Sequence, residues 1–284
     1  MKNVLVTGGV GFIGSNLIRE LIKHGCNIVS LDNYSTGTKN NEVKGVKYIN
    51  DDILKIKDLN RNFDTCFHLA AQSRVQPSFD DPKESLRVNV IGTTEVMEWA
   101  KLNNVKVIYA GSSSKHHDPS DSPYATYKFL GEEVCKLYKK SFNVKVEIAR
   151  FYNVYGPGEN IDEKFGNVIG IWSSKIKKNE PIPIVGDGKQ KRDFIHVYDL
   201  VDGLVKIAKS NHVHSDAWEL GSGINYSVNE LYSFFYKKYN VKSVYLPDQP
   251  GNYRKTLRIN DDALKLLNWR PNDRLKSHIE NLNL

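Results

Sequence analysis

Short runs of β-branched and apolar residues alternate along the first half of the chain with longer amphipathic stretches of helical period. This pattern predicts six strands, over 3–7, 27–31, 46–49, 64–69, 105–110 and 144–150, and three helices, over 12–24, 84–103 and 123–141. Strands that alternate with helices form βαβ units and pair in parallel. The sequence therefore predicts an α/β fold with a Rossmann-type, doubly wound parallel sheet.

The regular alternation of strand and helix patterns ends after residue 156, where prolines and glycines separate shorter elements. We expect residues 1–156 to form a dinucleotide-binding domain, and the strand–helix pair in 190–212 to return to it. The remaining segments, 157–189 and 213–284, are then expected to form a smaller, C-terminal substrate-binding lobe.

Composition narrows the class of protein. Of the 284 residues, 40% are hydrophobic and 26% are charged, which excludes a disordered chain, a collagen and a disulfide scaffold. No run of 18 apolar residues predicts a membrane span, and the chain begins on a strand pattern rather than a signal peptide. Cys26, Cys66 and Cys135 are scattered without metal-ligand spacing, so we expect reduced thiols, no metal site and a cytoplasmic protein.

The formal charge is +7, from 40 Lys and Arg against 33 Asp and Glu. The lysines are spread along predicted helices and turns, as solvated faces are. The excess mildly favours an anionic ligand such as a sugar nucleotide, but no dense arginine stripe predicts nucleic-acid binding.

A glycine-rich turn joins the first predicted strand to the first helix. Gly8 permits the tight turn, Gly11 lets a diphosphate approach the backbone, and Gly14 lets the helix pack on the strand. The helix that begins near Phe12 presents free N–H groups to phosphate. Asp32 ends the second strand, 18 residues after Gly14, where a carboxylate accepts ribose hydroxyls and repels a 2′-phosphate. The turn therefore predicts NAD rather than NADP.

A tyrosine and a lysine four residues apart begin the third predicted helix. Ser122 suits the N-cap and Pro123 the first helical position, and the spacing places Tyr124 and Lys128 on one face. An ammonium beside a phenol lowers the phenol pKa from about 10 toward neutrality. Tyr124 is thus predicted as a general acid/base, with Tyr127 its non-catalytic neighbour.

Three serines, Ser112-Ser113-Ser114, follow the strand over 105–110. Hydroxyls at the carboxyl end of a parallel strand lie where such sheets bind ligands. One of them is predicted to hydrogen-bond the substrate oxygen on which Tyr124 acts.

Several further motifs occur in the same order as in a known family. The chain resembles the extended short-chain dehydrogenases/reductases, in particular the NAD-dependent nucleotide-sugar epimerases and dehydratases. The motifs are Thr7-Gly8-Gly9-Val10-Gly11-Phe12-Ile13-Gly14, Asp52-Ile53, His68-Leu69-Ala70-Ala71, Asn89-Val90-Ile91-Gly92-Thr93, Tyr124 with Lys128, Arg150-Phe151-Tyr152-Asn153-Val154-Tyr155-Gly156-Pro157 and Arg192-Asp193-Phe194-Ile195-His196-Val197.

The resemblance implies that NAD is the cofactor, and which residues contact it. Asp52 and Ile53 would flank the adenine, Asn89 would fix the loop after the fourth strand, and Tyr152 would lie beside the nicotinamide. The implied contacts are Gly8, Gly11, Phe12, Ile13, Gly14, Asp32, Asn33, Tyr34, Ser35, Thr36, Gly37, Asp52, Ile53, Leu69, Ala70, Ala71, Gln72, Ser73, Asn89, Tyr124, Lys128 and Tyr152.

The resemblance also implies a nucleotide-sugar site. Arg192 would bind the nucleotide diphosphate as a fork, the alternative being a surface ion pair with Asp193 or Asp199. His196 would be structural. The implied substrate contacts are Ser112, Ser113, Tyr124, Asn153, Asn167, Val168, Val185, Arg192, Arg254 and Thr256.

The loop after the fifth strand distinguishes reactions within the resembled family. Dehydratases carry Thr-Asp-Glu there and decarboxylases Thr-Ser-Glu, whereas this chain has Ser112-Ser113-Ser114 and then Lys115-His116-His117, without a carboxylate. The pattern is that of a 4-epimerase acting on a UDP-hexose or UDP-N-acetylhexosamine through a 4-keto sugar. The alternatives are a 4,6-dehydratase or another NAD-linked nucleotide-sugar enzyme, and a Rossmann-fold binding protein without turnover.

The chain departs from the resembled pattern at two loops. Lys115-His116-His117 replaces Val-Tyr-Gly, and only 11 residues separate Ser112 from Tyr124. This register makes Ser112 the catalytic hydroxyl, with Ser113 as the fallback, and the histidines are interpreted as exposed loop residues or as an extra acid/base. Gln249-Pro250-Gly251-Asn252 replaces Arg-Pro-Gly-Asp, and Arg254 is the candidate substitute for the missing arginine.

Two further expectations follow from the resemblance. Thr256 stands where a small side chain leaves room for an acetamido group. The helices over 84–103 and 123–141 resemble those that pair two subunits, so a homodimer is expected. Their apolar residues Val96, Met97, Trp99, Leu130, Val134 and Leu137 also suit an ordinary core.

Overall fold

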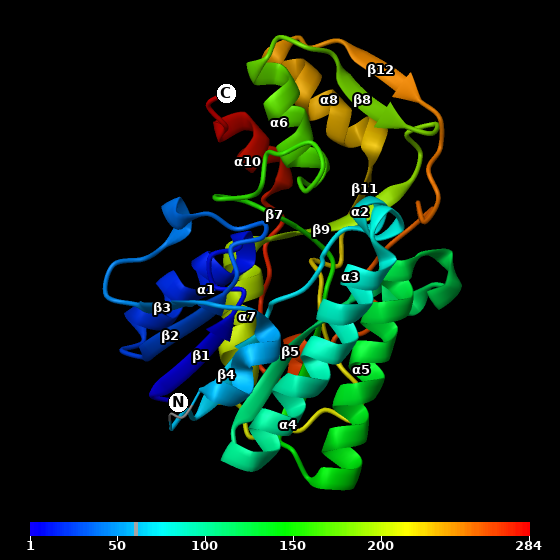
Figure 1. Ribbon diagram of the computed structural model, residues 1–284. Helices are drawn as coiled ribbons and strands as arrows, with labels where there is room; N and C mark the ends of the chain where they lie inside the picture. Colours follow the sequence, from blue (N-terminus) through cyan, green and yellow to red (C-terminus); the bar gives the residue numbers. More distant parts are fainter. Residues whose placement is uncertain (60–61) are drawn as a thin grey trace.

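A seven-stranded parallel sheet forms the centre of the computed structural model, which describes residues 1–59 and 62–284 (Figure 1). Its strand order is β10-β6-β5-β4-β1-β2-β3, and every neighbouring pair runs parallel. The strands are β1 (Asn3–Thr7), β2 (Asn27–Asp32), β3 (Lys47–Asn50), β4 (Thr65–His68), β5 (Lys106–Ser112), β6 (Val146–Phe151) and β10 (Trp218–Leu220). The predicted fold class and the six predicted strands are confirmed.

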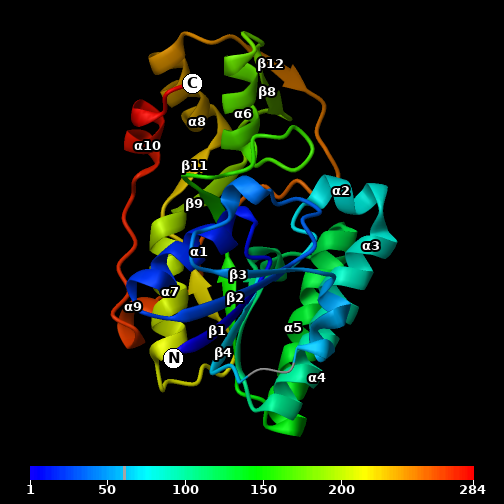
Figure 2. The ribbon, with the colours of Figure 1, turned by 60° about the vertical axis from the view of Figure 1, so that its left-hand side comes forward.

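Helices cover both faces of this sheet (Figure 2). α1 (Phe12–Lys23) and α7 (Val197–Lys209) lie on one face, and α4 (Thr93–Asn103) and α5 (Pro123–Phe142) lie on the other. Along β1, Val4 and Val6 pack with residues of α1 and α7, while Leu5 packs with residues of α4 and α5. Because successive side chains of a strand point to opposite faces, a strand that is apolar throughout is buried on both.

The predicted helix over 84–103 is interrupted. α3 (Pro82–Leu86) leads into a wider, π-helical turn over Arg87–Gly92 and then into α4. Asn89 lies in this turn, where its side chain bonds to the backbone of Gln72 at 2.9 and 3.0 Å. Such turns occur mostly as single turns inside α-helices, so the sequence pattern predicted one continuous helix here.

The predicted helix over 123–141 is confirmed as α5. The Ser122 hydroxyl accepts the N–H of Ala125 at 3.1 Å, as an N-cap does, and Pro123 occupies the first turn. The helix ends at Asn143, whose φ of 55° is left-handed.

A smaller lobe lies at the carboxyl ends of the central strands (Figure 1). It contains a three-stranded sheet, β11-β9-β7, and a parallel pair, β12-β8. Trp172, Phe235 and Ile279 lie in its core. Its elements are β7 (Asn153–Tyr155), α6 (Val168–Lys177), β8 (Ile182–Val185), β9 (Lys191–His196), β11 (Asn225–Ser227), α8 (Val228–Tyr239), β12 (Ser243–Leu246) and α10 (Leu275–Asn281).

The segments connect the two lobes several times. α7 packs against α1, whereas β9, which precedes it, pairs with β7 and β11 outside the central sheet. β10 forms an edge of the central sheet although its residues fall within 213–284. α9 (Asp262–Leu266) packs near β10, and α2 (Val75–Asp80) follows β4. The lobe boundaries stated above stay a prediction. Across residues 1–59 and 62–284, no helix combines the length and the apolarity needed to cross a membrane.

Candidate functional site

The glycine turn between β1 and α1 is packed tightly at two of its three glycines. Gly8 has a φ of +74°, and a Cβ there would lie 2.8 Å from the backbone nitrogen of Ala70. A Cβ on Gly14 would lie 2.1 Å from the Gly8 oxygen. At Gly11 the same oxygen, at 3.2 Å, is the only neighbour, so the turn is open there. The glycine turn is therefore open at Gly11, where a diphosphate would approach the N-terminus of α1.

Asp32 ends β2 beside this turn. Its carboxylate accepts the N–H groups of Val10 at 3.0 Å and Tyr34 at 2.8 Å. Burial raises the pKa of Asp32, and the two N–H groups oppose this increase. Tyr34 does not line the site, because its hydroxyl donates to Glu42 at 2.7 Å.

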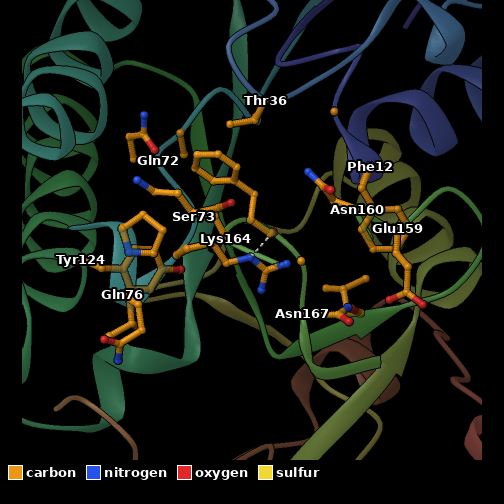
Figure 3. Close-up of a pocket in the computed structure, with 18 of the residues that line it drawn as sticks. Phe12, Thr36, Gln72, Ser73, Gln76, Tyr124, Glu159, Asn160, Lys164 and Asn167 are labelled. Carbon is orange, nitrogen blue, oxygen red and sulfur yellow. Dashed lines mark hydrogen bonds between the residues drawn. The ribbon is translucent and has the colours of Figure 1, made fainter. Parts of the chain in front are cut away.

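A cleft of about 1520 Å³ runs between the two lobes and over the carboxyl ends of the central strands (Figure 3). Most of the predicted site residues line it. They are Gly8, Gly11, Phe12, Ile13, Gly14, Asp32, Asn33, Ser35, Thr36, Gly37, Asp52, Ile53, Leu69, Ala70, Ala71, Gln72, Ser73, Ser112, Ser113, Tyr124, Lys128, Tyr152, Asn153, Asn167, Val168, Val185, Arg192 and Thr256. The fold therefore collects into one cleft residues that are far apart in the sequence.

Three predicted residues lie outside the cleft: Tyr34, Asn89 and Arg254. Asn89 supports the cleft indirectly through its two bonds to the Gln72 backbone. Arg254 pairs with Asp187 at 3.0 Å, and its side chain is 65% exposed. Tyr34 and Arg254 are therefore not proposed as ligand contacts.

Tyr124 and Ser112 are in contact. The Tyr124 hydroxyl donates to Ser112 Oγ at 3.2 Å, and the Ser114 hydroxyl donates to the same oxygen at 2.9 Å. Ser112 is the last residue of β5 and Tyr124 the second residue of α5. The structure thus pairs Ser112, rather than Ser113, with the tyrosine.

The pKa of Tyr124 is raised, because burial outweighs the lowering effects of Ser112 and Arg74. The expected lowering by Lys128 is wrong for this arrangement of side chains, since Lys128 Nζ donates to the Ala110 oxygen at 2.8 Å. Burial lowers the pKa of Lys128 to about 8. Lysine and tyrosine share a helix face, but each has its own partner on β5.

Arg192 lies on β9 and lines the substrate side of the cleft. Its Nη2 donates to Asn252 Oδ1 at 2.6 Å, and burial lowers its pKa to about 10. The alternative ion pairs are not formed, because Asp193 accepts the Ser222 hydroxyl at 2.8 Å and Asp199 pairs with Arg274 at 2.9 Å. Arg192 therefore keeps a desolvated positive charge at the cleft, as an anion site requires.

Thr256 is buried in the wall of the cleft. Its hydroxyl accepts the Asp193 N–H at 3.1 Å and lies 3.3 Å from the Asn153 amide nitrogen. Asn167 caps α6, where its side chain accepts the Gly170 N–H at 2.9 Å. These three predicted substrate residues are thus held by the smaller lobe's own hydrogen bonds.

Arg74 and Glu159 are two of the charged cleft residues that the sequence did not predict. Arg74, at the start of α2, donates through Nε to the Phe165 oxygen at 2.8 Å and so bridges the lobes. Glu159, near Asn167 in Figure 3, is half-buried with its Oε2 atom out of contact with solvent, and this burial raises its pKa to about 8. Both stand in segments without a repeating pattern, so the sequence holds no signal that separates them from surface residues.

Both loop histidines contact residues from distant parts of the sequence. His117 stacks on Tyr253 with ring centroids 3.8 Å apart, and His116 Nε2 lies 3.0 Å from Glu219 Oε1. The interpretation of these histidines as exposed loop residues is therefore wrong. The described residues contain no cluster of three metal-ligating side chains.

Comparison with known proteins gives consistent matches. A model of the NAD dependent epimerase/dehydratase family matches residues 4–221. A UDP-glucose 4-epimerase of Mycolicibacterium smegmatis is 30% identical, over 94% of this chain and 93% of that protein. UDP-glucuronic acid decarboxylase 4 of Arabidopsis thaliana is 29% identical, over 94% of this chain but 65% of that protein. The crystal structure of UDP-glucuronic acid 4-epimerase from Bacillus cereus, with UDP-glucuronic acid and NAD, has a TM-score of 0.89 at 27% identity, covering 98% of this chain and 96% of that chain.

Proposed function

Because this chain belongs to the NAD-dependent epimerase/dehydratase family, we propose that it is a UDP-sugar 4-epimerase with Tyr124 as its acid/base. NAD is the cofactor of this family, and the open space at Gly11 and the half-buried carboxylate of Asp32 fit it. The observation that carries the proposal is the contact of Tyr124 with Ser112 in a cleft wall whose loop, 112–117, holds no carboxylate. Elimination of water or loss of carbon dioxide would need further groups there, whereas epimerisation needs a reversible proton transfer together with the hydride exchange that NAD would supply.

Tyr124 and Ser112 would share the oxygen on C4 of the sugar. In the oxidative half, the ionised Tyr124 oxygen takes the proton of the C4 hydroxyl while the Ser112 hydroxyl holds that oxygen in place. NAD, when bound, accepts and returns the hydride at C4. The keto sugar then rotates in the site and presents its other face. In the return half, Tyr124 gives the proton back to the C4 oxygen, so no net redox change occurs.

The remaining residues would bind and orient the substrate. Arg192 supplies the positive charge for the diphosphate, and Asn153 lies beside Thr256 at the sugar end of the same wall. Lys128, whose pKa burial lowers to about 8, lines the same cleft and is held by its hydrogen bond to the Ala110 oxygen.

Two further expectations accompany this proposal. We propose that two copies pair through α4 and α5, because Leu130 and Leu137 are 37% and 53% exposed on α5. The cytoplasm as the site of action stays a prediction from cysteine usage.

The proposal is tested by incubating the protein with UDP-glucose, UDP-N-acetylglucosamine and UDP-glucuronic acid and resolving the C4 epimers. Wild type is expected to interconvert at least one pair, and Tyr124→Phe to lose at least ~100-fold in kcat. Tyr127→Phe, in the next turn of the same helix, is the matched control. A 4-keto product would indicate a dehydratase, release of carbon dioxide a decarboxylase, and no turnover of any UDP-sugar a binding protein.

A further inference from the structure

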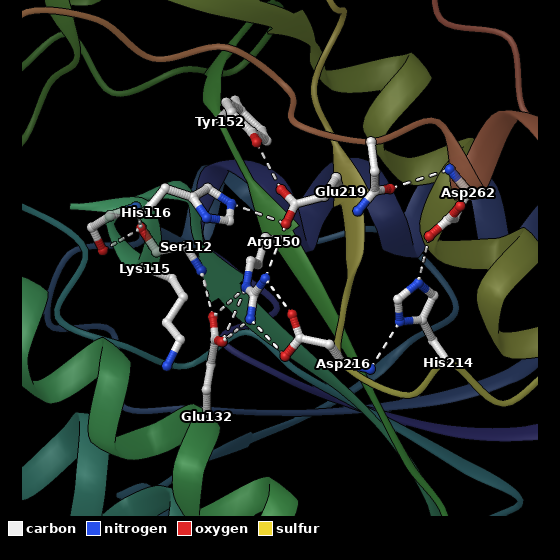
Figure 4. A network of polar contacts seen from close by, with 12 residues as sticks. Ser112, Lys115, His116, Glu132, Arg150, Tyr152, His214, Asp216, Glu219 and Asp262 are labelled. Atoms are coloured by element: carbon white, nitrogen blue, oxygen red, sulfur yellow. Dashed lines mark hydrogen bonds and ion pairs between the residues drawn. The ribbon is translucent and has the colours of Figure 1, made fainter.

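His116 does not line the cleft, and its ring faces a network of polar contacts around Arg150 and Glu219 (Figure 4). It lies in the single 3₁₀ turn, Ser113–His116, that follows β5. Its Nε2 is 3.0 Å from Oε1 of Glu219, which lies in the middle of β10 and has no exposed surface. A carboxylate only accepts hydrogen bonds, so the imidazole nitrogen donates.

Glu219 connects His116 to a residue of the cleft wall. Its second oxygen accepts the hydroxyl of Tyr152 at 2.7 Å, and Oε1 also accepts Nη1 of Arg150 at 3.0 Å. Tyr152 lines the cleft, and Figure 4 shows its hydroxyl directed to Glu219. The position of the Tyr152 ring therefore depends on where the Glu219 carboxylate is held.

A second branch of the network ends on Ser112. Arg150 donates through Nη2 to Glu132 Oε2 at 2.8 Å, and Glu132 Oε1 accepts the backbone N–H of Ser112 at 3.4 Å. Ser112 is the residue in contact with Tyr124. The network that His116 joins therefore ends on two cleft residues: Tyr152 at the end of one branch and Ser112 at the end of the other.

His116 adds a hydrogen-bond donor, and a cation when it is protonated, to a network that contains several carboxylates. Glu132 and Glu219 are both fully buried and share one cation, Arg150. The third acid, Asp216, is 48% exposed and is also paired with Lys136 at 2.8 Å. A positive charge on His116 would stabilise the buried Glu219 carboxylate, whose other ion-pair partner among the described residues is Arg150. Burial alone would raise the pKa of Glu219, but the hydrogen bonds from His116 and Tyr152 bring it below its ordinary value.

We propose that His116 is a positioning residue, whose charged hydrogen bond to Glu219 holds Tyr152 and Ser112 in their places in the cleft. This inference rests on the proposed function only where its test measures kcat; the structural test below does not depend on it. It replaces the interpretation of His116 as an extra acid/base, since His116 does not line the cleft and its Nε2 is bound to Glu219. The other charged groups of the network are Arg150 on β6, Glu132 on α5 and Asp216, while Lys115 and the titratable His117 flank His116 in the chain.

The test separates charge compensation from simple folding. His116→Gln keeps a hydrogen-bond donor but removes the charge, and we expect kcat to fall about 10-fold with KM changed less than about 3-fold. The double variant His116→Gln/Glu219→Gln removes both charges, so it is expected to recover kcat to within about 3-fold of wild type. His24→Gln, the same change at a surface histidine, is the control and leaves kcat unchanged.

Three outcomes would overturn the proposal: wild-type kcat in His116→Gln, no recovery in the double variant, or a loss of kcat matched by loss of folded protein in thermal unfolding. A crystal structure of His116→Gln provides a readout that does not depend on turnover. We expect the Tyr152 hydroxyl and Ser112 to be displaced from their wild-type positions, and unchanged positions would refute the inference. If wild type turned over no UDP-sugar, the proposed function would fail while this structural comparison would still test the positioning role.

Discussion

The hydroxyl of Tyr124 donates to the Ser112 hydroxyl at 3.2 Å, although only 11 residues separate the two, one at the end of β5 and the other at the start of α5. Two short 3₁₀ turns, Ser113–His116 and Pro119–Asp121, fold this connection compactly. A short loop is therefore sufficient to bring the two hydroxyls together at the cleft.

The serine that contacts Tyr124 should be separable from its neighbour by mutation. We expect Ser112→Ala to lower kcat by about 10- to 100-fold, because the alanine cannot hold the C4 oxygen in line with the phenol. Ser113→Ala, which removes a hydroxyl from the next residue, is expected to change kcat less than about 3-fold. The measurement is initial-rate epimerisation; a larger loss in Ser113→Ala would exchange the roles of the two serines.

Glu159 should make stability depend on pH. Burial raises its pKa to about 8, against an opposing hydrogen bond from Asn167. The folded protein thus binds a proton that the unfolded chain releases near pH 4.3, so stability falls as pH rises from about 4.5 through about 8. We expect Glu159→Gln to raise Tm at pH 8.5 by about 2–4 °C and to change it little at pH 4.5.

The measurement is thermal unfolding of both proteins at the two pH values. Glu163→Gln, on the same segment but paired at the surface with Lys175 and Lys178, is the matched control. A lower Tm for Glu159→Gln at pH 8.5 would show that the carboxylate is charged and stabilising.

Thr256 should influence which sugars fit. Its side chain lines the cleft beside Asn153, so a bulky residue would occupy space at the sugar end. We expect Thr256→Tyr to lower kcat/KM for UDP-N-acetylglucosamine at least ~10-fold more than for UDP-glucose. Thr256→Ser, which keeps the hydroxyl bonded to the Asp193 N–H, should leave the ratio unchanged. An equal loss on both substrates would contradict the size argument.

The dimer proposal predicts a change in mass. Leu130 and Leu137 are exposed on α5, and Glu at both positions would place charge in an apolar interface. We expect wild type to sediment as a dimer and Leu130→Glu/Leu137→Glu as a monomer. A wild-type monomer, or a dimer in the double variant, would exclude this interface.

Local patterns in the sequence predict the first half of the fold well. The alternation of β1 with the glycine turn and α1, and the spacing of Tyr124 and Lys128 on α5, each follow from periodicity and capping that a few consecutive residues carry. Asp32 and Ser112 were located in the same way, at the ends of strands that the pattern bounds.

Contacts between distant segments were not predictable from these patterns. Glu219 lies on β10, a three-residue strand more than 100 residues after His116, and nothing near either residue encodes their contact. The π-helical turn at Asn89 depends on a side chain bonding to Gln72. The pKa of Tyr124 likewise depends on burial and on Arg74, which only the folded structure brings near.

The proposed chemistry is tested most directly with UDP-glucose that carries deuterium at C4. If Tyr124 serves a reversible oxidation at C4, the hydrogen that leaves this carbon returns to it, and mass spectrometry of the UDP-galactose formed in ordinary water should show the deuterium retained at C4. Loss of the deuterium to solvent, or release of a keto sugar in place of the C4 epimer, would contradict the account.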